Sequence, residues 1–257
     1  DILKSRLLHL ISKDSPSKPD RMLYSKIWEA CENMENYFER NVRKLFPKTN
    51  WLSISKEQFA RFDGSIFKYK EDEIHATNGL ENTSLSLSAI LGSGLLYQKA
   101  EIESILKQDD VEEDDAEKIY CRSIINFSQL LLHTYRIYLA RTGKPDFEHP
   151  FHIKYLLDIF KSLEKEDEGY IRGFFLCLWQ VRYAFDKYVV KWAQKSEDKE
   201  EELKITNISS SDKNNNRFFS RSQPEGRDAV TMLQSVLYFT GNYNTQIWLS
   251  PFLKRML

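Results

Sequence analysis

Three stretches between residues 124 and 189 place apolar residues at every third or fourth position, the repeat of an α-helix with one buried face. The positions are Ile124, Phe127, Leu131, Tyr135 and Tyr138; Ile153, Leu156, Leu157, Phe160 and Leu163; and Ile171, Phe174, Leu178, Phe185 and Val189. Helix breakers or charged residues separate the stretches, at 142–145 and at 164–169. Three such helices bury their apolar faces by packing together, so this pattern predicts a helical bundle.

The composition favours the same fold class. The 257 residues include only nine Gly and seven Pro, which is low for an all-β chain or a dinucleotide-binding chain. We therefore predict an all-α protein, an irregular multi-helix bundle with a loop-rich segment near 48–80. The formal net charge of −1 creates no overall field that would attract nucleic acid or an anionic membrane, so any such contact must be local.

The chain is expected to have three parts. Residues 1–195 are predicted to form the helical bundle domain, with early helices over 3–11 and from Asp20 to Pro47. Residues 196–226 are charged and then rich in Ser and Asn, which predicts a mobile linker or loop. Residues 227–257 are predicted to form a pair of helices that packs on the bundle, and the apolar residues of the first are Val230, Leu233, Val236 and Leu237.

Several features bear on where the protein acts. The sequence begins with Asp1, inside an amphipathic pattern, so we expect it to be a piece of a longer polypeptide. No apolar run approaches the roughly 18 residues of a membrane span and no signal peptide is visible, which predicts a cytoplasmic protein without a membrane partner. Cys31, Cys121 and Cys177 lie far apart among apolar residues and are predicted to be buried, reduced thiols.

Motifs for catalysis are missing from this sequence. It has no Walker A loop, no Gly-x-Ser-x-Gly elbow, no Cys-x-x-Cys pair and no dinucleotide fingerprint. His149 and His152 could hold a metal together with Asp146 or Glu148, but the other histidines lie in unrelated segments and a metal site needs three or four converging ligands. We predict no catalytic residue, metal or cofactor here; a metal-dependent hydrolase built on the two histidines is the least favoured alternative.

Basic residues along a predicted helix over 171–195 form the first candidate contact site. They are Arg182, Lys187, Lys191 and Lys195, interleaved with Trp and Tyr residues. Basic residues beside aromatics can grip a nucleic-acid backbone and stack bases, and the three lysines, four positions apart, are predicted to form one exposed stripe facing nucleic acid or a partner domain. The alternative is a structural role, with Arg182 paired to Asp186 and long side-chain stems covering core aromatics.

Two arginines flanking a pair of aromatics form the second candidate site. Arg217 and Arg221 surround Phe218 and Phe219 in the predicted linker. Exposed aromatics between arginines suggest a contact surface for nucleic acid or another domain. Docking of this segment on its own domain is the alternative.

Four ordered motifs carry a resemblance to a known family. They are Asp1-Ile-Leu-Lys-Ser-Arg-Leu-Leu8, Lys26-Ile-Trp-Glu-Ala-Cys-Glu-Asn-Met34, the segment from Leu178 to Lys191, and Met232-Leu-Gln-Ser-Val-Leu237 with Trp248-Leu249. In order and spacing they resemble the helical region of proteins that carry the GmrSD-type restriction endonuclease N-terminal domain. The resemblance extends over nearly the whole chain.

In that family a ParB/sulfiredoxin-like N-terminal domain carries an Asp-Gly-Gln-Gln-Arg motif and is associated with nucleotide-driven restriction of modified phage DNA; some members add an HNH nuclease. Here Asp63-Gly64 is followed by Ser65, so the motif is missing, and no HNH-like histidine cluster appears. The resemblance implies a helical accessory or sensing domain of a bacterial anti-phage, modification-dependent restriction protein. Its implied partners are an N-terminal domain of the same polypeptide and possibly DNA, and any NTP-dependent endonuclease activity would belong to the full-length protein. The alternative is a stand-alone helical interaction module with no nucleic-acid role.

Overall fold

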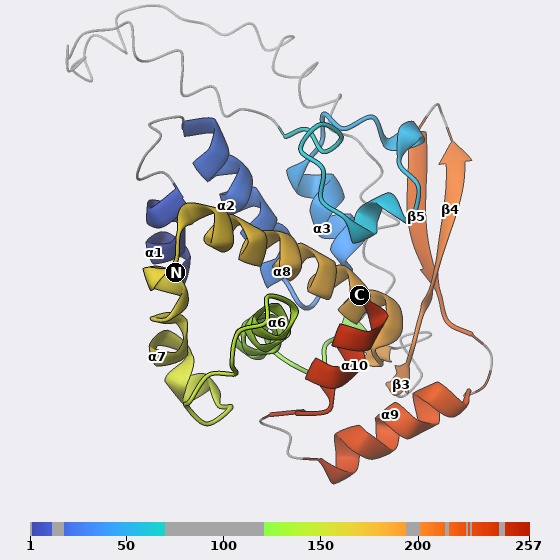
Figure 1. Cartoon of the computed structure of the whole chain (residues 1–257). Helices are drawn as coiled ribbons and strands as arrows, with labels where there is room; N and C mark the ends of the chain where they lie inside the picture. The colour runs from blue at the N-terminus through green and yellow to red at the C-terminus, as the bar shows by residue number, and fades with distance from the viewer. Residues whose placement is uncertain are drawn as a thin grey trace, which may run out of the picture. The chain divides into compact units, whose positions relative to one another are not determined.

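A computed structural model of the chain describes residues 2–11, 18–69, 121–193, 201–213, 216–224, 226, 228–241 and 245–257. These residues belong to one compact unit that combines helices with short strands (Figure 1). The α-helices are α1 (Ile2–Ile11), α2 (Lys18–Glu32), α3 (Phe38–Leu45), α6 (Phe127–Arg141), α7 (Leu156–Phe160), α8 (Glu168–Tyr188), α9 (Ala229–Thr240) and α10 (Leu249–Met256). The strands are β1 (Cys121–Arg122), β2 (Lys191–Ala193), β3 (Glu202–Lys204), β4 (Asn207–Lys213) and β5 (Asn216–Ser222).

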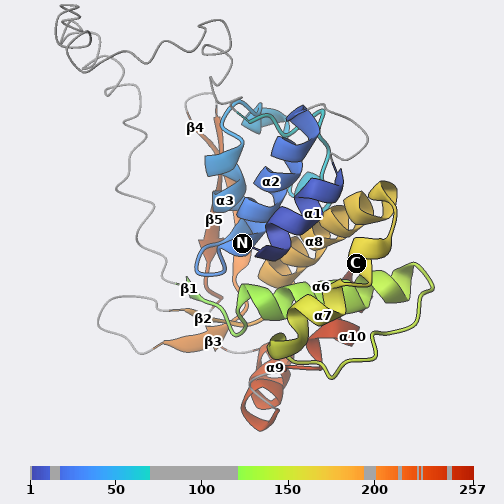
Figure 2. The same cartoon turned by 90° about the vertical axis from the view of Figure 1, so that its left-hand side faces the viewer.

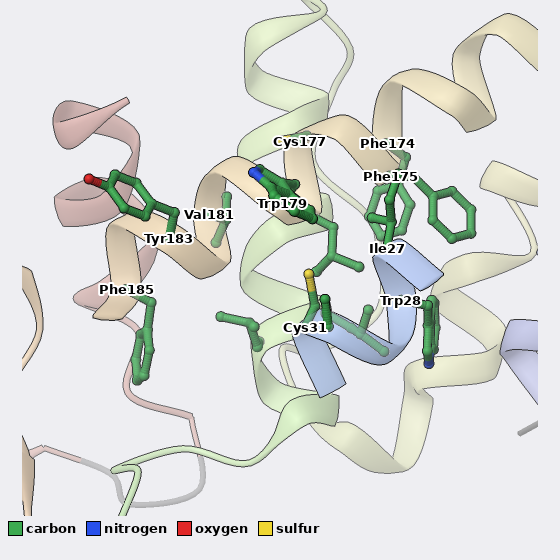
Figure 3. Packing of buried hydrophobic residues seen from close by; sticks show 14 of the residues in the cluster. Ile27, Trp28, Cys31, Phe174, Phe175, Cys177, Trp179, Val181, Tyr183 and Phe185 are labelled. Atoms are coloured by element: carbon green, nitrogen blue, oxygen red, sulfur yellow. The ribbon is translucent and has the colours of Figure 1, made fainter. Parts of the chain in front are cut away.

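Helix α8 lies at the centre of the unit and contacts α1, α2, α3, α6 and α10. It begins at Asp167, whose carboxylate accepts a hydrogen bond from the Tyr170 N–H at 2.9 Å and so caps the first turn. It ends at Tyr188 because Val189 takes an extended conformation. Figure 3 shows the apolar side of α8 facing α2, with Phe175 near Trp28. This contact forms the middle of the hydrophobic core.

Residues 48–69 have no long helix but are held firmly by aromatic side chains. Their regular structure is limited to the 3-10 turns Trp51–Ser53 and Gln58–Ala60, as expected for a loop-rich segment; residues 70–80 of that prediction lie outside the described residues. The indole of Trp179 donates a hydrogen bond to the Phe59 carbonyl at 2.7 Å, and the Tyr183 hydroxyl donates to the Lys56 carbonyl at 2.8 Å. Because these donors come from buried positions of α8, they fix the segment to the core.

The helix expected from Asp20 to Pro47 is divided into α2 and α3 by a turn. The amide of Asn41 donates to the carbonyls of Ala30 and Asn33 at 3.0 and 2.9 Å. These bonds satisfy carbonyl groups that a continuous helix would have paired within its own backbone. A buried asparagine on α3 therefore stabilises the end of α2.

Two antiparallel sheets overturn the all-α prediction. In one sheet β2 pairs with β1 and with β3; in the other β4 pairs with β5, from Asn207↔Ser222 to Lys213↔Asn216. The sequence of β4 is polar and almost all of its residues are exposed, so it lacks the alternation of apolar and polar residues that marks a half-buried strand. The backbone pairing of a mostly solvated hairpin leaves little trace in the hydrophobic pattern.

The segment 196–226, expected to be a linker, contains β3, β4 and β5. Phe219 packs edge-on against Phe59 with ring centroids 4.9 Å apart, and the Lys56 ammonium donates to the Ile208 carbonyl at 2.8 Å. The hairpin thus docks on residues 51–59. In the C-terminal part, α10 buries Leu249 and Leu253 and contacts α6 and α8.

Helices α6 and α8 approach closely at Gly173. A Cβ atom at this position would overlap the hydroxyl oxygen of Tyr138, which donates a hydrogen bond to the Tyr170 carbonyl at 2.8 Å. We expect Gly173→Ala to lower the free energy of unfolding by about 1–3 kcal/mol, because Tyr138 must move and its bond is lost. Chemical denaturation measures the change. Gly64→Ala is the control, since a Cβ there meets its nearest atom at 3.7 Å; equal stability losses would contradict the close-approach argument.

Candidate protein-interaction surface

Three of the predicted contact residues converge in a buried charge cluster, defined by Arg182, Lys191, Arg221, Glu39 and Asp186. Arg182 and Lys191 both form ion pairs with Asp186 Oδ1. The guanidinium of Arg221 binds both carboxylate oxygens of Glu39, at 2.5 and 2.9 Å. The exposed fractions of Arg182, Lys191 and Arg221 are 0%, 1% and 7%, so these cations are shielded from a nucleic-acid backbone.

Asp186 is the centre of this cluster. Its Oδ2 accepts a hydrogen bond from the Phe38 N–H at 2.6 Å, in addition to its ion pairs. Burial raises the pKa of this carboxyl group, but the charges of Arg182, Lys191 and Arg221 outweigh burial, and the net shift lowers the pKa. The group therefore stays ionised in the core.

The arginines of the cluster also bind backbone carbonyl groups from distant segments. Arg182 donates to the carbonyls of Cys31, Asn33 and Asn36 at 3.1, 3.0 and 2.8 Å, and so fastens the turn between α2 and α3. Arg221 donates to the carbonyl of Asp186 at 3.1 Å and so fastens β5 to α8. The predicted pair between Arg182 and Asp186 exists, and both side chains are fully buried.

The other predicted contact residues lie apart from the cluster. Lys187 extends over the rings of Tyr183 and Tyr188. Helix α8 ends at Tyr188 and Lys191 belongs to β2, so Lys187 and Lys191 do not lie on one helical stripe as predicted. Lys195 lies outside the described residues. Arg217 binds Asp212 across the hairpin at 2.8 and 3.0 Å; it also donates to the Ile54 carbonyl at 3.2 Å, so the hairpin docks on its own domain.

The two histidines weighed as metal ligands serve the local structure. His149 stacks on Tyr155, and His152 Nδ1 accepts a hydrogen bond from the Lys154 N–H at 3.1 Å. Within the described part of the chain, no group of three or more His, Cys, Asp or Glu residues is placed to hold a metal ion.

Cys31, Cys121 and Cys177 are buried and free, as predicted, and burial raises the pKa of Cys177 to about 11. No described helix is long and apolar enough to span a bilayer.

Helix α9 presents the most unusual surface of the described residues, because its polar side faces the protein and its apolar side faces solvent. Thr231 and Gln234 are buried, at 3% and 2% exposure. The apolar face of α9 consists of Val230, Met232, Leu233, Val236 and Phe239, which are 49–59% exposed. Large contiguous exposed apolar patches mark interaction sites on soluble proteins.

The buried polar residues anchor α9 to the end of α8. Gln234 Oε1 accepts a hydrogen bond from the Val190 N–H at 3.0 Å, and its Nε2 donates to the Tyr188 carbonyl at 2.8 Å. The Asp228 carboxylate caps the first turn by accepting from the Thr231 N–H at 2.6 Å. Both views place α9 at one end of the unit, near β3 (Figures 1 and 2). The helix is thus fixed by hydrogen bonds and by ring contacts of Tyr238 and Phe239 with Trp192, and most of its apolar face is left uncovered by the described residues.

The sequence pattern revealed the apolar positions of α9 but suggested the opposite orientation. Val230, Leu233 and Val236 follow a helical repeat, and the simplest interpretation is that they face the core. Helix α9 contains no charged residue on either face, so no side of it is marked as the solvated one. The only hint in the sequence that this helix is unusual was its complete lack of charged residues; the apolar repeat gave no such hint.

Comparisons with known proteins identify no relative of this chain. No family model, no curated protein and no solved structure matches the chain. The resemblance to the GmrSD-type family stays a prediction from the sequence motifs.

Proposed function

We propose that this chain is a non-catalytic interaction domain that binds another protein surface through the apolar face of α9. In line with the sequence motifs, we further propose that it serves a bacterial anti-phage restriction protein, in which other parts of the assembly act on DNA. The single observation that carries the interaction role is the exposure of five large apolar side chains on one uncharged helix.

The reversed orientation of α9 supports this proposal. Hydrogen bonds between the Gln234 amide and the backbone of Val190 and Tyr188, together with ring contacts of Tyr238 and Phe239 with Trp192, hold the helix in place and leave most of its apolar surface exposed. Exposed apolar surface of this extent raises the risk of aggregation, and contact with a partner would remove it from water. Helix-in-groove and helix-on-helix recognition both use apolar residues at this spacing.

The direct nucleic-acid role receives less support. Four of the six basic residues that suggested it are engaged elsewhere, with Arg182, Lys191 and Arg221 in the buried charge cluster and Arg217 bound to Asp212. Phosphate contacts need cations that reach the surface. In the proposed restriction protein, DNA contact would therefore be a task for another part.

Plating of phages with modified DNA on bacteria that carry the complete gene tests this function. We expect the intact gene to reduce plaque numbers, and the double variant Leu233→Asp, Val236→Asp to restore them to the level of cells without the gene. The exposed site of the variant should leave the melting temperature nearly unchanged.

Ile2→Asp is the matched control, because Ile2 is 62% exposed but lies on α1, away from the apolar face of α9. It should keep full protection. Full protection by the α9 variant would contradict the interaction role, whereas a complete gene without any protective effect would contradict the restriction role.

A further inference from the structure

The apolar face of α9 has the chemistry of a surface that can bind itself. Its members are aliphatic, thioether or phenyl groups, and the helix carries neither acidic nor basic side chains. A partner rich in charge would lose hydration against this face without gaining ion pairs. A second uncharged apolar helix fits it better.

The extent of the face is suited to the core of a dimer contact. Each of the five side chains is 49–59% exposed, which corresponds to about 90 Å² per side chain, or about 450 Å² per chain. Two copies would bury about 900 Å² of apolar core surface. A specific interface buries roughly 1,200–2,000 Å² in total, so this apolar core would supply more than half of the lower figure and polar surface around it would have to supply the rest.

Symmetry also favours a second copy. When two identical chains meet about a twofold axis, the same patch serves both sides, and α9 of one chain crosses α9 of the other. Leu233 lies near the middle of Ala229–Thr240, so it lies close to such an axis and near its counterpart. No charged side chain of α9 opposes a like charge in this arrangement.

We infer that the partner of the apolar face of α9 is a second copy of this chain, in a twofold dimer with the two α9 helices in contact. This inference rests on the interaction role proposed above and specifies the partner. The dimer would place two copies of any attached domain in a symmetric pair.

Sedimentation equilibrium of the purified chain tests the inference, with two variants that place opposite charges at position 233. At about 100 µM, where even weak interfaces of this size are populated, the wild-type chain should be a dimer. Leu233→Asp and Leu233→Lys should each be monomeric, because a dimer of either variant would bury two like charges, one from each copy, near the twofold axis. An equimolar mixture of the two variants should recover dimers, since opposite charges then meet across the axis.

Circular dichroism melting of both variants separates loss of contact from loss of fold, and Ile2→Asp should stay dimeric. A monomeric wild-type chain at this concentration would overturn the inference, while the plating result for the α9 variant would still decide the interaction role on its own. Dimeric single variants, or a mixture that stays monomeric, would overturn the α9 contact.

Discussion

Replacing Asp186 with alanine is expected to lower the free energy of unfolding by about 3–5 kcal/mol, the largest effect of any single substitution proposed for this protein. The change removes the carboxylate that faces Arg182 and Lys191 and that accepts the hydrogen bond of the Phe38 N–H. Two cations would be left in the core without their anion, and one buried donor would lose its acceptor. Equilibrium denaturation in urea measures the loss.

Asp212→Ala is the matched control for this experiment. Asp212 also pairs with an arginine, Arg217, but its side chain is 52% exposed. Because water screens an exposed pair, the control should change stability far less than Asp186→Ala does. Similar losses in the two variants would show that burial does not set the strength of the Asp186 cluster.

Acid is expected to destabilise the protein through His133, a fully buried histidine whose Nδ1 lies 2.8 Å from the Ser250 hydroxyl oxygen. Burial, with a smaller contribution from the charge of Arg136, lowers the pKa of His133 from 6.5 to about 3. Between these two pKa values the unfolded chain binds a proton that the folded protein excludes. Stability is therefore complete above pH 6.5 and falls as the pH drops toward 3, by about 3 kcal/mol between pH 7 and pH 4.

The pH dependence can be assigned with a variant that cannot titrate. His133→Asn keeps a polar atom near Ser250 but has no protonation step, so its stability should fall less steeply than that of the wild-type protein over the same pH range. His149→Gln is the control for replacing a histidine, because His149 is exposed whereas His133 is fully buried. Parallel curves for the wild-type protein and His133→Asn would contradict the assignment to His133.

The sequence predicted two of the long helices that carry a buried apolar face. The third stretch, 153–163, was predicted as one helix but is divided into two 3-10 turns and the short helix α7, and its Ile153 and Leu157 are exposed. The repeats of Ile171, Phe174 and Phe185 correspond to α8, and that of Leu131 and Tyr135 to α6. These elements are visible in the sequence because burial against several neighbours selects apolar residues along the whole helix. The burial of the three cysteines followed from the same local pattern.

Strand β4 was invisible in the sequence because its residues are mostly solvated. Pairing of β4 with β5 uses backbone groups, which every residue possesses, so Ser209 and Ser220 can face each other without any hydrophobic signal. Asn214-Asn215 separate the two strands in the sequence, and asparagine is common in two-residue hairpin connections. That signal alone could have raised the possibility of a hairpin.

The basic residues show most clearly what the sequence alone determined and what required the tertiary structure. The sequence determined that Arg182 could reach Asp186 one helical turn away, which is a local relation. It could not show that Lys191 and Arg221, 9 and 39 positions after Arg182, lie in the same buried cluster, since these contacts depend on where β2 and β5 pack. Likewise, the repeat of Leu233 and Val236 defined an apolar face on α9, but only the packing of Gln234 against the end of α8 decided that this face points to solvent. Periodicity fixes which residues share a side of a helix, whereas the side that is buried depends on contacts between segments far apart in the chain.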